Sequence, residues 1–363
     1  MFKDDVEFIK DVFGSGDEFL PLHPPYFDNR EIKLTTECIK STFVSSVGQF
    51  VVDFENKIAE FCGVKRAVAC VNGTNALHLS LLLAGVKPCD KVVTQPLTFI
   101  ATANAIKYCN AEPVFIDVDR DTMGLSPEKL EEYLKKHKNI KAAVSMHTFG
   151  HPCKINAIKE VCERYNVILV EDCAESLGSF YNGVHTGNFG LIAAVSFNGN
   201  KTITTGGGGM LLFNDDKLAD KAKHLTTQAK IPHRWEFRHD AIGYNYRMPN
   251  LNAALGLAQL EKIDKILENK RELAKIYKEY FKDRFVSEPK DCKSNYWLQA
   301  IMLEDRKERD AFLTYTNDNG VMTRPIWTLM NELDMFKTCE CGNLENAKYI
   351  GERLVNIPSG VRL

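Results

Sequence analysis

The 363-residue sequence has no apolar run near the roughly 20 residues that a membrane-spanning helix needs. Its first residues, MFKDDVEFIKDVFG, lack the basic region and apolar core of a signal peptide. Charge of one sign is not in excess either, because the formal net charge is −2 and the pI is about 6.5. These absences give no electrostatic reason to bind nucleic acid or a membrane surface, and we expect a cytoplasmic protein without such partners.

The sequence also lacks the pattern of a disulfide framework or a metal site. Its 11 cysteines are odd in number and scattered, and many lie in apolar runs such as AVACV, which is typical of buried, reduced thiols. Cys339 and Cys341 have no second Cys or His pair nearby at zinc-ligand spacing. The segment DVDRDTMGLSPE has calcium-loop spacing, but Thr122 stands where that loop needs glycine, and a strand-like run precedes it. We therefore expect no metal.

Through the middle of the chain, short β-rich runs such as KVVTQ and VILVED alternate with helical segments. Continuously apolar strands separated by helices predict a mostly parallel sheet with helices on both faces. The long helical pattern LNAALGLAQLEKIDKILENKRELAKIYKEYFKDR then leads to a strand candidate, YWLQAIML, as in a smaller α+β domain. The predicted divisions are a separate amphipathic N-terminal extension over 1–22, a large domain over 23–250 and a small C-terminal domain over 251–363.

A lysine stands in an unusual setting in SFNGNKTITTGGGGM, residues 196–210. A phosphate-binding P-loop needs Gly directly before the lysine and a helix after it, whereas Asn200 precedes Lys201 and a strand-like MLLF follows. A dinucleotide-binding fingerprint fails because its glycines also open a helix. Two interpretations stay open: a surface turn with a solvated lysine, and a loop that presents an amine for covalent chemistry.

Polar residues stand at the carboxyl ends of several predicted strands, where open α/β sheets bind ligands. After AVACV, Gly73 permits close backbone approach, and Thr74 and Asn75 lie at a helix N-terminus that favours a phosphate. VILVED ends in Glu171 and Asp172. Singly, each feature has an ordinary explanation as a turn or a helix cap.

Together, these residues meet the needs of pyridoxal phosphate. Its aldehyde needs a lysine amine, its phosphate a helix N-terminus with hydroxyl donors, and its pyridine nitrogen a carboxylate. Ser196 precedes Lys201 by five residues, and Phe99, at another strand end, is available to hold the ring. Lys201 is thus expected to present the amine, and the glycines to let the backbone pass close to the cofactor.

With these residues in place, the chain resembles the DegT/DnrJ/EryC1/StrS family of sugar aminotransferases, which make amino sugars for bacterial surface polysaccharides and antibiotics. Segments from LHPPYFDNREI to NIPSG carry the resemblance, among them NGTNALHLSLLLAGV, QPLTFIATANAI, EDCAESLGS and GYNYRMPNLNAALGLAQLEKI. It implies the α/β aspartate aminotransferase-like fold (fold type I), with a mostly parallel central sheet, helices on both faces and a smaller C-terminal α+β domain.

The resemblance also implies site roles. Lys201 is similar to the family's Schiff-base lysine and proton shuttle, Asp172 to the partner of the pyridine nitrogen and Phe99 to the ring-stacking aromatic. Glu175 stands where the family packs a polar side chain against the cofactor. The phosphate ligands implied in this way are Thr74, Asn75 and Ser196.

Asn245, in GYNYRM, matches an asparagine that reaches the neighbouring subunit's cofactor phosphate, which implies a homodimer with shared active sites. Arg247 and Trp327 stand where relatives contact the nucleotide-sugar. Two departures matter: Gly207 replaces the Glu of the frequent TTGEGGM, so that acid's role is in doubt, and the chain stops soon after NIPSG, where relatives often continue into a final helix.

The activity implied is transfer of an amino group from L-glutamate to C4 of a nucleotide-linked 4-keto-6-deoxy sugar. The chain looks most like enzymes acting on UDP-2-acetamido-4-keto-2,6-dideoxyhexoses, and GDP- or dTDP-linked substrates stay open because no readable motif contacts the base. Two rivals are a pyridoxamine phosphate-dependent dehydratase of the same family, in which His replaces the lysine, and a catalytically silent regulator. The presence of both Lys201 and Asp172 argues against them.

Overall fold

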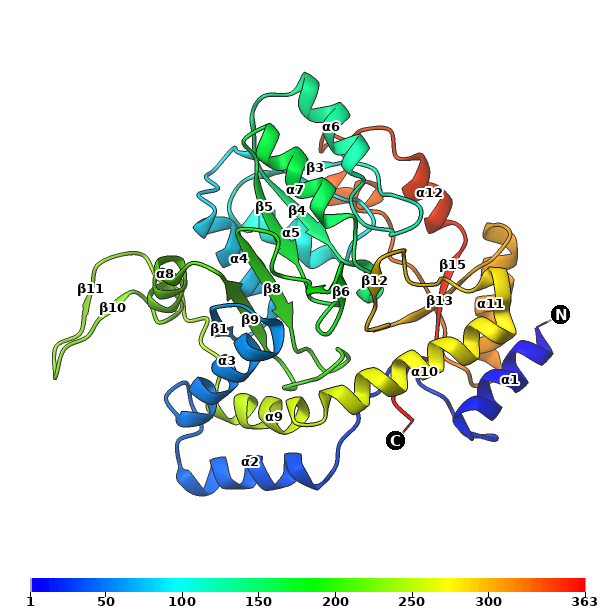
Figure 1. The fold of residues 1–363 in the computed structure, drawn as a ribbon, viewed down its shortest axis with the longest axis horizontal. Coiled ribbons are helices and arrows are strands. Elements are labelled where there is room, and N and C mark those ends of the chain that lie inside the picture. Colours follow the sequence, from blue (N-terminus) through cyan, green and yellow to red (C-terminus); the bar gives the residue numbers. More distant parts are fainter. Residues whose placement is uncertain (1, 363) are drawn as a thin grey trace.

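The structure, a computed structural model, describes residues 2–362 and is built around a seven-stranded sheet in the order β1-β9-β8-β5-β4-β2-β3 (Figure 1). β9 runs antiparallel to both of its neighbours, and the other pairs are parallel. This confirms the mostly parallel central sheet. The strands are β1 (Arg66–Cys70), β2 (Lys91–Thr94), β3 (Glu112–Phe115), β4 (Ile140–Met146), β5 (Ile168–Asp172), β8 (Ile192–Ser196) and β9 (Gly209–Phe213).

Helices cover both faces of this sheet, because successive strand residues point to opposite sides. In β1, Val68 and Cys70 pack into one hydrophobic cluster with α4, α5 and α8, while Ala67 and Ala69 pack into another with α3 and α9. The helices are α3 (Gln49–Cys62), α4 (Gly73–Leu83), α5 (Ile100–Tyr108), α6 (Pro127–Lys136), α7 (Ile155–Arg164), α8 (Asp216–Thr226) and α9 (Asn250–Leu260). The Ser126 side chain caps α6 by accepting the Lys129 backbone N–H.

The long helical pattern after residue 250 forms two helices, α9 and α10 (Ile263–Phe281), and not one. The break falls at Lys262, whose φ and ψ are −116° and 11°. The buried Lys262 ammonium pairs with Glu31 and with Asp28, the latter at 3.5 Å, at the start of α2 (Asn29–Ser41). We attribute the break to this buried ion pair, which hydrophobic periodicity alone does not reveal.

α10 leads to a second, three-stranded sheet in the order β13-β15-β14 (Figure 1). The strand candidate YWLQAIML is strand only in its middle, as β13 (Gln299–Met302). The amphipathic N-terminal stretch forms α1 (Lys3–Phe13), which packs on α10, where the Phe8 and Tyr280 rings stack with their centroids 3.6 Å apart. The remaining elements here are β14 (Arg324–Pro325), β15 (Leu354–Ile357), α11 (Arg306–Asp318) and α12 (Glu345–Gly351).

Short elements complete the chain. β12 (Cys292–Lys293), β6 (Phe180–Tyr181) and β7 (Val184–His185) form one small sheet, and β10 (Lys230–Ile231) and β11 (Arg238–His239) form a hairpin that projects from the body (Figure 1). All 11 cysteines are free thiols, seven of them buried. Among residues 2–362, no helix combines the length and apolarity needed to cross a membrane.

Candidate active site

A cavity of about 390 Å³ lies at the carboxyl ends of the central strands. Residues from the starts of α4 and α5, the end of β5, the end of β8 and the loop after β8 line it, together with two tryptophans from the second half of the chain. The structure thus brings together eight of the eleven predicted site residues: Gly73, Thr74, Phe99, Asp172, Glu175, Ser196, Lys201 and Trp327. Asn75, Asn245 and Arg247 do not line the cavity.

Lys201 lies on the loop between β8 and β9 and points into the cavity. Its side chain is only 12% exposed, and its Nζ lies 3.3 Å from Glu175 Oε1 and 3.8 Å from the centroid of the Trp297 ring. This arrangement excludes the solvated-turn interpretation, since the amine is held between a carboxylate and an aromatic face. Only the end of the glycine-rich run that follows packs tightly: a Cβ on Gly209 would lie 2.4 Å from the Asn72 carbonyl oxygen.

Glu175 is the carboxylate beside that amine. It is 2% exposed, and its Oε2 accepts the Phe149 N–H at 2.8 Å. Burial raises the pKa of Glu175 to about 7, against the lowering effect of the Lys201 cation. The group therefore changes protonation within the ordinary working range of pH.

Asp172 occupies the end of β5 and is 2% exposed. The Thr102 hydroxyl donates to Asp172 Oδ2 at 2.7 Å, and the Ala174 N–H donates to Oδ1 at 3.1 Å. Burial raises the pKa of Asp172, and the Thr102 hydrogen bond opposes that rise. A buried carboxylate fixed in this way is a suitable acceptor for a protonated pyridine nitrogen.

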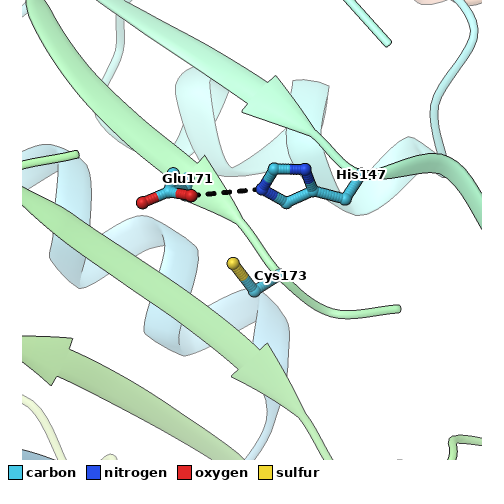
Figure 2. A group of neighbouring side chains, drawn as sticks. All are labelled: His147, Glu171 and Cys173. Carbon is cyan, nitrogen blue, oxygen red and sulfur yellow. Dashed lines mark hydrogen bonds and ion pairs between the residues drawn. The ribbon is translucent and has the colours of Figure 1, made fainter. Parts of the chain in front are cut away.

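Glu171, the other acid of VILVED, joins a buried cluster with His147 and Cys173 outside the cavity lining (Figure 2). His147 Nε2 lies 3.2 Å from Glu171, and His147 Nδ1 accepts the Cys153 N–H at 3.2 Å. Glu171 also accepts the backbone N–H groups of Gly187, Phe189 and Gly190. Because these hydrogen bonds engage the carboxylate and both ring nitrogens, the cluster is an anchor that ties β5 to neighbouring loops. The backbone N–H of His147 adds a further tie by donating to the Asp172 carbonyl oxygen at 3.3 Å.

The start of α4 forms a cradle suited to a phosphate. Asn72 caps the helix by accepting the Asn75 N–H at 2.8 Å, and the first turn faces the cavity at Gly73 and Thr74. A Cβ on Gly73 would lie 2.8 Å from the Ser196 Cβ, so only glycine lets β8 and the helix start approach this closely. Helix N–H groups and the Thr74 and Ser196 hydroxyls are the donors that a phosphate needs. The cavity residues therefore fit pyridoxal phosphate at both of its ends.

Aromatic side chains form another part of the cavity wall. Phe99 precedes α5 and is 50% exposed, and its ring meets the Trp327 ring edge-on with the ring centroids 6.3 Å apart.

Two residues of the cavity, Trp297 and Thr102, were not predicted from the sequence. Thr102 follows Phe99 by three residues, a helical spacing that could have revealed it. No local signal identifies Trp297, since it reaches the cavity only through long-range packing.

Asn245 and Arg247 lie side by side on the surface of this chain. The Arg247 guanidinium donates to Asn245 Oδ1 from Nε at 3.2 Å and from Nη2 at 3.0 Å. Isolated antiparallel β-bridges pair Asn245 with Thr227 and Arg247 with Cys70. At Gly207, an added Cβ would meet nothing within 4 Å. Packing therefore does not explain the absence of the family's Glu there.

Replacing Glu175 by Gln should change how stability depends on pH in the cofactor-free protein. Burial raises the pKa of Glu175 to about 7 in the folded state. Between the ordinary pKa of a glutamate and this value, the folded protein therefore keeps a proton that the unfolded protein has already released. As pH rises through this window, the wild type should lose roughly 1.4 kcal/mol of unfolding free energy per pH unit relative to the variant. Chemical denaturation of both proteins at several pH values in this window measures their unfolding free energies. A difference between the two free energies that stays constant with pH would contradict the prediction.

Comparisons with known proteins agree with this site. A family model described as the DegT/DnrJ/EryC1/StrS aminotransferase family matches residues 25–363. The chain is 40% identical to the GDP-perosamine synthase of Escherichia coli O157:H7 over 344 residues, which cover 94% of this chain and 93% of that protein. It is 35% identical to the UDP-4-amino-4,6-dideoxy-N-acetyl-beta-L-altrosamine transaminase of Campylobacter jejuni over 289 residues, 79% of this chain and 73% of the relative.

Among solved structures, the aminotransferase TlmJ from Streptoalloteichus hindustanus superposes with a TM-score of 0.89 at 30% identity, covering 94% of this chain and 93% of its own. This similarity confirms the predicted aminotransferase fold. The aminotransferases of the family use pyridoxal phosphate. The chain therefore belongs to the DegT/DnrJ/EryC1/StrS family and is a pyridoxal phosphate-dependent sugar aminotransferase.

Proposed function

We propose that the enzyme transfers the amino group of L-glutamate to C4 of a nucleotide-linked 4-keto-6-deoxy sugar. The observation that carries this proposal is the Lys201 amine, which enters a cavity that also presents the buried Asp172 carboxylate and a helix start suited to a phosphate. When bound, pyridoxal phosphate supplies an aldehyde that accepts the amino group and a protonated ring that withdraws electrons from the reacting carbon.

Each residue then has one task. Lys201 would hold the cofactor covalently and, once released, move the proton at the reacting carbon. Asp172 would accept the ring N–H and keep that nitrogen charged in a site shielded from water. Phe99 would cover one face of the ring, and Glu175 would hold the Lys201 amine in place, as their 3.3 Å separation indicates.

The phosphate would lie on the cradle at the start of α4. Thr74 and Ser196 would donate their hydroxyls, and Gly73 would let the backbone approach. The assignment of Asn75 rests on the resemblance alone, because its backbone N–H is engaged by Asn72. Arg247 and Trp327 are proposed to contact the nucleotide-sugar. We also propose that the N-terminal extension, the large domain and the small domain divide near residues 22 and 250.

We further propose a homodimer in which each site is completed by the other subunit. Two parts of the surface, one at α2 and one at the β10–β11 hairpin, expose large apolar side chains, as surfaces that bind a partner subunit do. On α2 and after it these are Ile32, Ile39, Phe43, Val44 and Val47. On and beside the projecting hairpin they are Trp235, Phe237 and Ile242. Asn245 follows this hairpin, is exposed, and does not line the cavity described above.

Mixing two inactive variants tests the shared site. If Asn245 serves the partner's cofactor phosphate, a mixed dimer of Lys201→Ala and Asn245→Ala subunits holds one site with both defects and one intact site. Activity should then partly return when the subunits exchange. The Asn245→Ala protein alone must first show weakened cofactor binding. If exchange is demonstrated and no activity returns, Asn245 serves its own subunit and the shared site is wrong.

UDP-, GDP- and dTDP-linked sugars are all candidates for the substrate. Motif resemblance favours a UDP-linked 2-acetamido-4-keto-2,6-dideoxyhexose, whereas the relative named GDP-perosamine synthase favours a GDP-linked sugar. An amino-transfer assay with glutamate and a panel of UDP-, GDP- and dTDP-linked 4-keto-6-deoxy sugars decides between them. We expect one nucleotide to be used far more efficiently than the others. Loss of water from a sugar without amino transfer would instead indicate the dehydratase, and inertness of a cofactor-loaded preparation would indicate the silent regulator.

A further inference from the structure

Lys270, in the middle of α10, is a fully buried cation that the site described above does not use. Its side chain is 0% exposed, and burial lowers its pKa to about 7. Within residues 2–362 its hydrogen bonds go to one imidazole and two carbonyl oxygens, and it makes no ion pair. Burying an ammonium group without a carboxylate is costly. A methionine of similar shape would fill the same space without that cost.

The three partners of this ammonium come from three separate parts of the chain. Lys270 Nζ lies 2.8 Å from His23 Nε2 in the N-terminal segment. It donates to the Trp297 carbonyl at 3.1 Å, just before β13, and to the Ser359 carbonyl at 2.7 Å, just after β15. One cation therefore joins the N-terminal segment, the second sheet and the C-terminal segment to α10.

Trp297 extends this junction into the cavity. Its indole Nε1–H donates to the Asn200 carbonyl at 2.6 Å, and Asn200 directly precedes Lys201. Its ring lies 3.8 Å from the Lys201 Nζ. The Trp297 indole thus contacts both the amine of Lys201 and the residue before it, Asn200. The backbone carbonyl of Trp297 is in turn bound by Lys270.

We propose that Lys270 is a positioning residue for Lys201. By binding His23 and the carbonyls of Trp297 and Ser359 together, its ammonium fixes the Trp297 indole against the reactive amine. This inference rests on the proposed role of Lys201. The charged form is the one that donates to all three acceptors, so the positioning weakens as Lys270 loses its proton. His23 is the titratable group in contact with Lys270, and burial and the Lys270 charge both lower the pKa of His23, which keeps its ring neutral as an acceptor.

The test measures how fast the cofactor-free full chain captures pyridoxal phosphate covalently, followed by absorbance over a range of pH. Lys270→Met should slow capture by about tenfold or more, because displacing a reacting group by ~1 Å can cost about 100-fold in rate. We expect capture by the wild type to slow as Lys270 deprotonates, and Lys270→Met should abolish this pH-dependent decline. Lys275→Met is the matched control, since Lys275 lies on the same helix, is exposed and pairs with Glu272 at the surface. It should capture the cofactor as the wild type does.

Two further variants keep the proposal falsifiable if Lys270→Met does not fold. His23→Leu removes one acceptor and should slow capture in the same direction. Trp297→Phe should slow capture on its own, and in that background a second change at His23 or Lys270 should add little. A folded Lys270→Met or His23→Leu protein with the wild-type rate and pH profile would overturn the proposal and leave Lys270 a purely structural residue. Failure of the wild type to capture the cofactor at all would instead overturn the proposed function.

Discussion

Lys201→Ala is expected to abolish covalent attachment of the cofactor and to lower amino transfer by at least about a thousandfold, as loss of a covalent catalyst does. The fold should survive, because the residue lies on a loop and its partner Glu175, with a pKa raised by burial to about 7, can take up a proton when the cation is removed. Borohydride treatment of the cofactor-loaded protein followed by mass spectrometry of its peptides measures the attachment.

The matched control for this substitution is Lys221→Ala, at an exposed position of α8. It should be labelled by borohydride and should turn over as the wild type does. If the Lys201→Ala protein were still labelled on another lysine and kept its turnover, the reactive amine would lie elsewhere and the role given to the loop after β8 would be wrong.

Asp172→Asn is expected to leave the cofactor bound and attached while lowering turnover by about a hundredfold to a thousandfold, the scale of losing one electrostatic partner of a transition state. The amide keeps the size of the carboxylate and can still receive the Ala174 N–H and meet the Thr102 hydroxyl. What it loses is the negative charge that holds the ring nitrogen protonated. Steady-state rates, with cofactor occupancy measured in parallel, test this prediction. Turnover near that of the wild type would remove Asp172 from the mechanism.

The parts of the site that lie at strand ends could be predicted from the sequence. Gly73, Asp172 and Ser196 each follow or end an apolar run, and the carboxyl ends of parallel strands meet at one edge of a sheet. Local pattern therefore sufficed to bring residues more than a hundred positions apart into one cavity. The same reasoning could not separate Glu171 from Asp172. The structure does so, because neighbouring strand residues point to opposite faces and Glu171 is engaged by the loop that contains Gly187.

The parts that depend on packing between distant segments could not be predicted. Trp297 carries no motif, and its place against Lys201 is set by contacts with Asn200 and Lys270. The break between α9 and α10 has a similar origin, since hydrophobic periodicity continues through Lys262 while its buried charge pairs with the start of α2. Buried lysines of this kind look like surface residues in a sequence, because their burial follows from the completed fold.

The proposed amino transfer can be tested directly by following the nitrogen atom that moves. The cofactor-loaded enzyme is given L-glutamate labelled isotopically in its amino group, together with each nucleotide-linked 4-keto-6-deoxy sugar, and the products are identified by mass spectrometry. We expect one nucleotide-sugar to gain the labelled amino group at C4 while an equal amount of 2-oxoglutarate forms, and Lys201→Ala to yield neither product. A cofactor-loaded enzyme that leaves every such sugar unlabelled, or that places the label at another carbon, would contradict it.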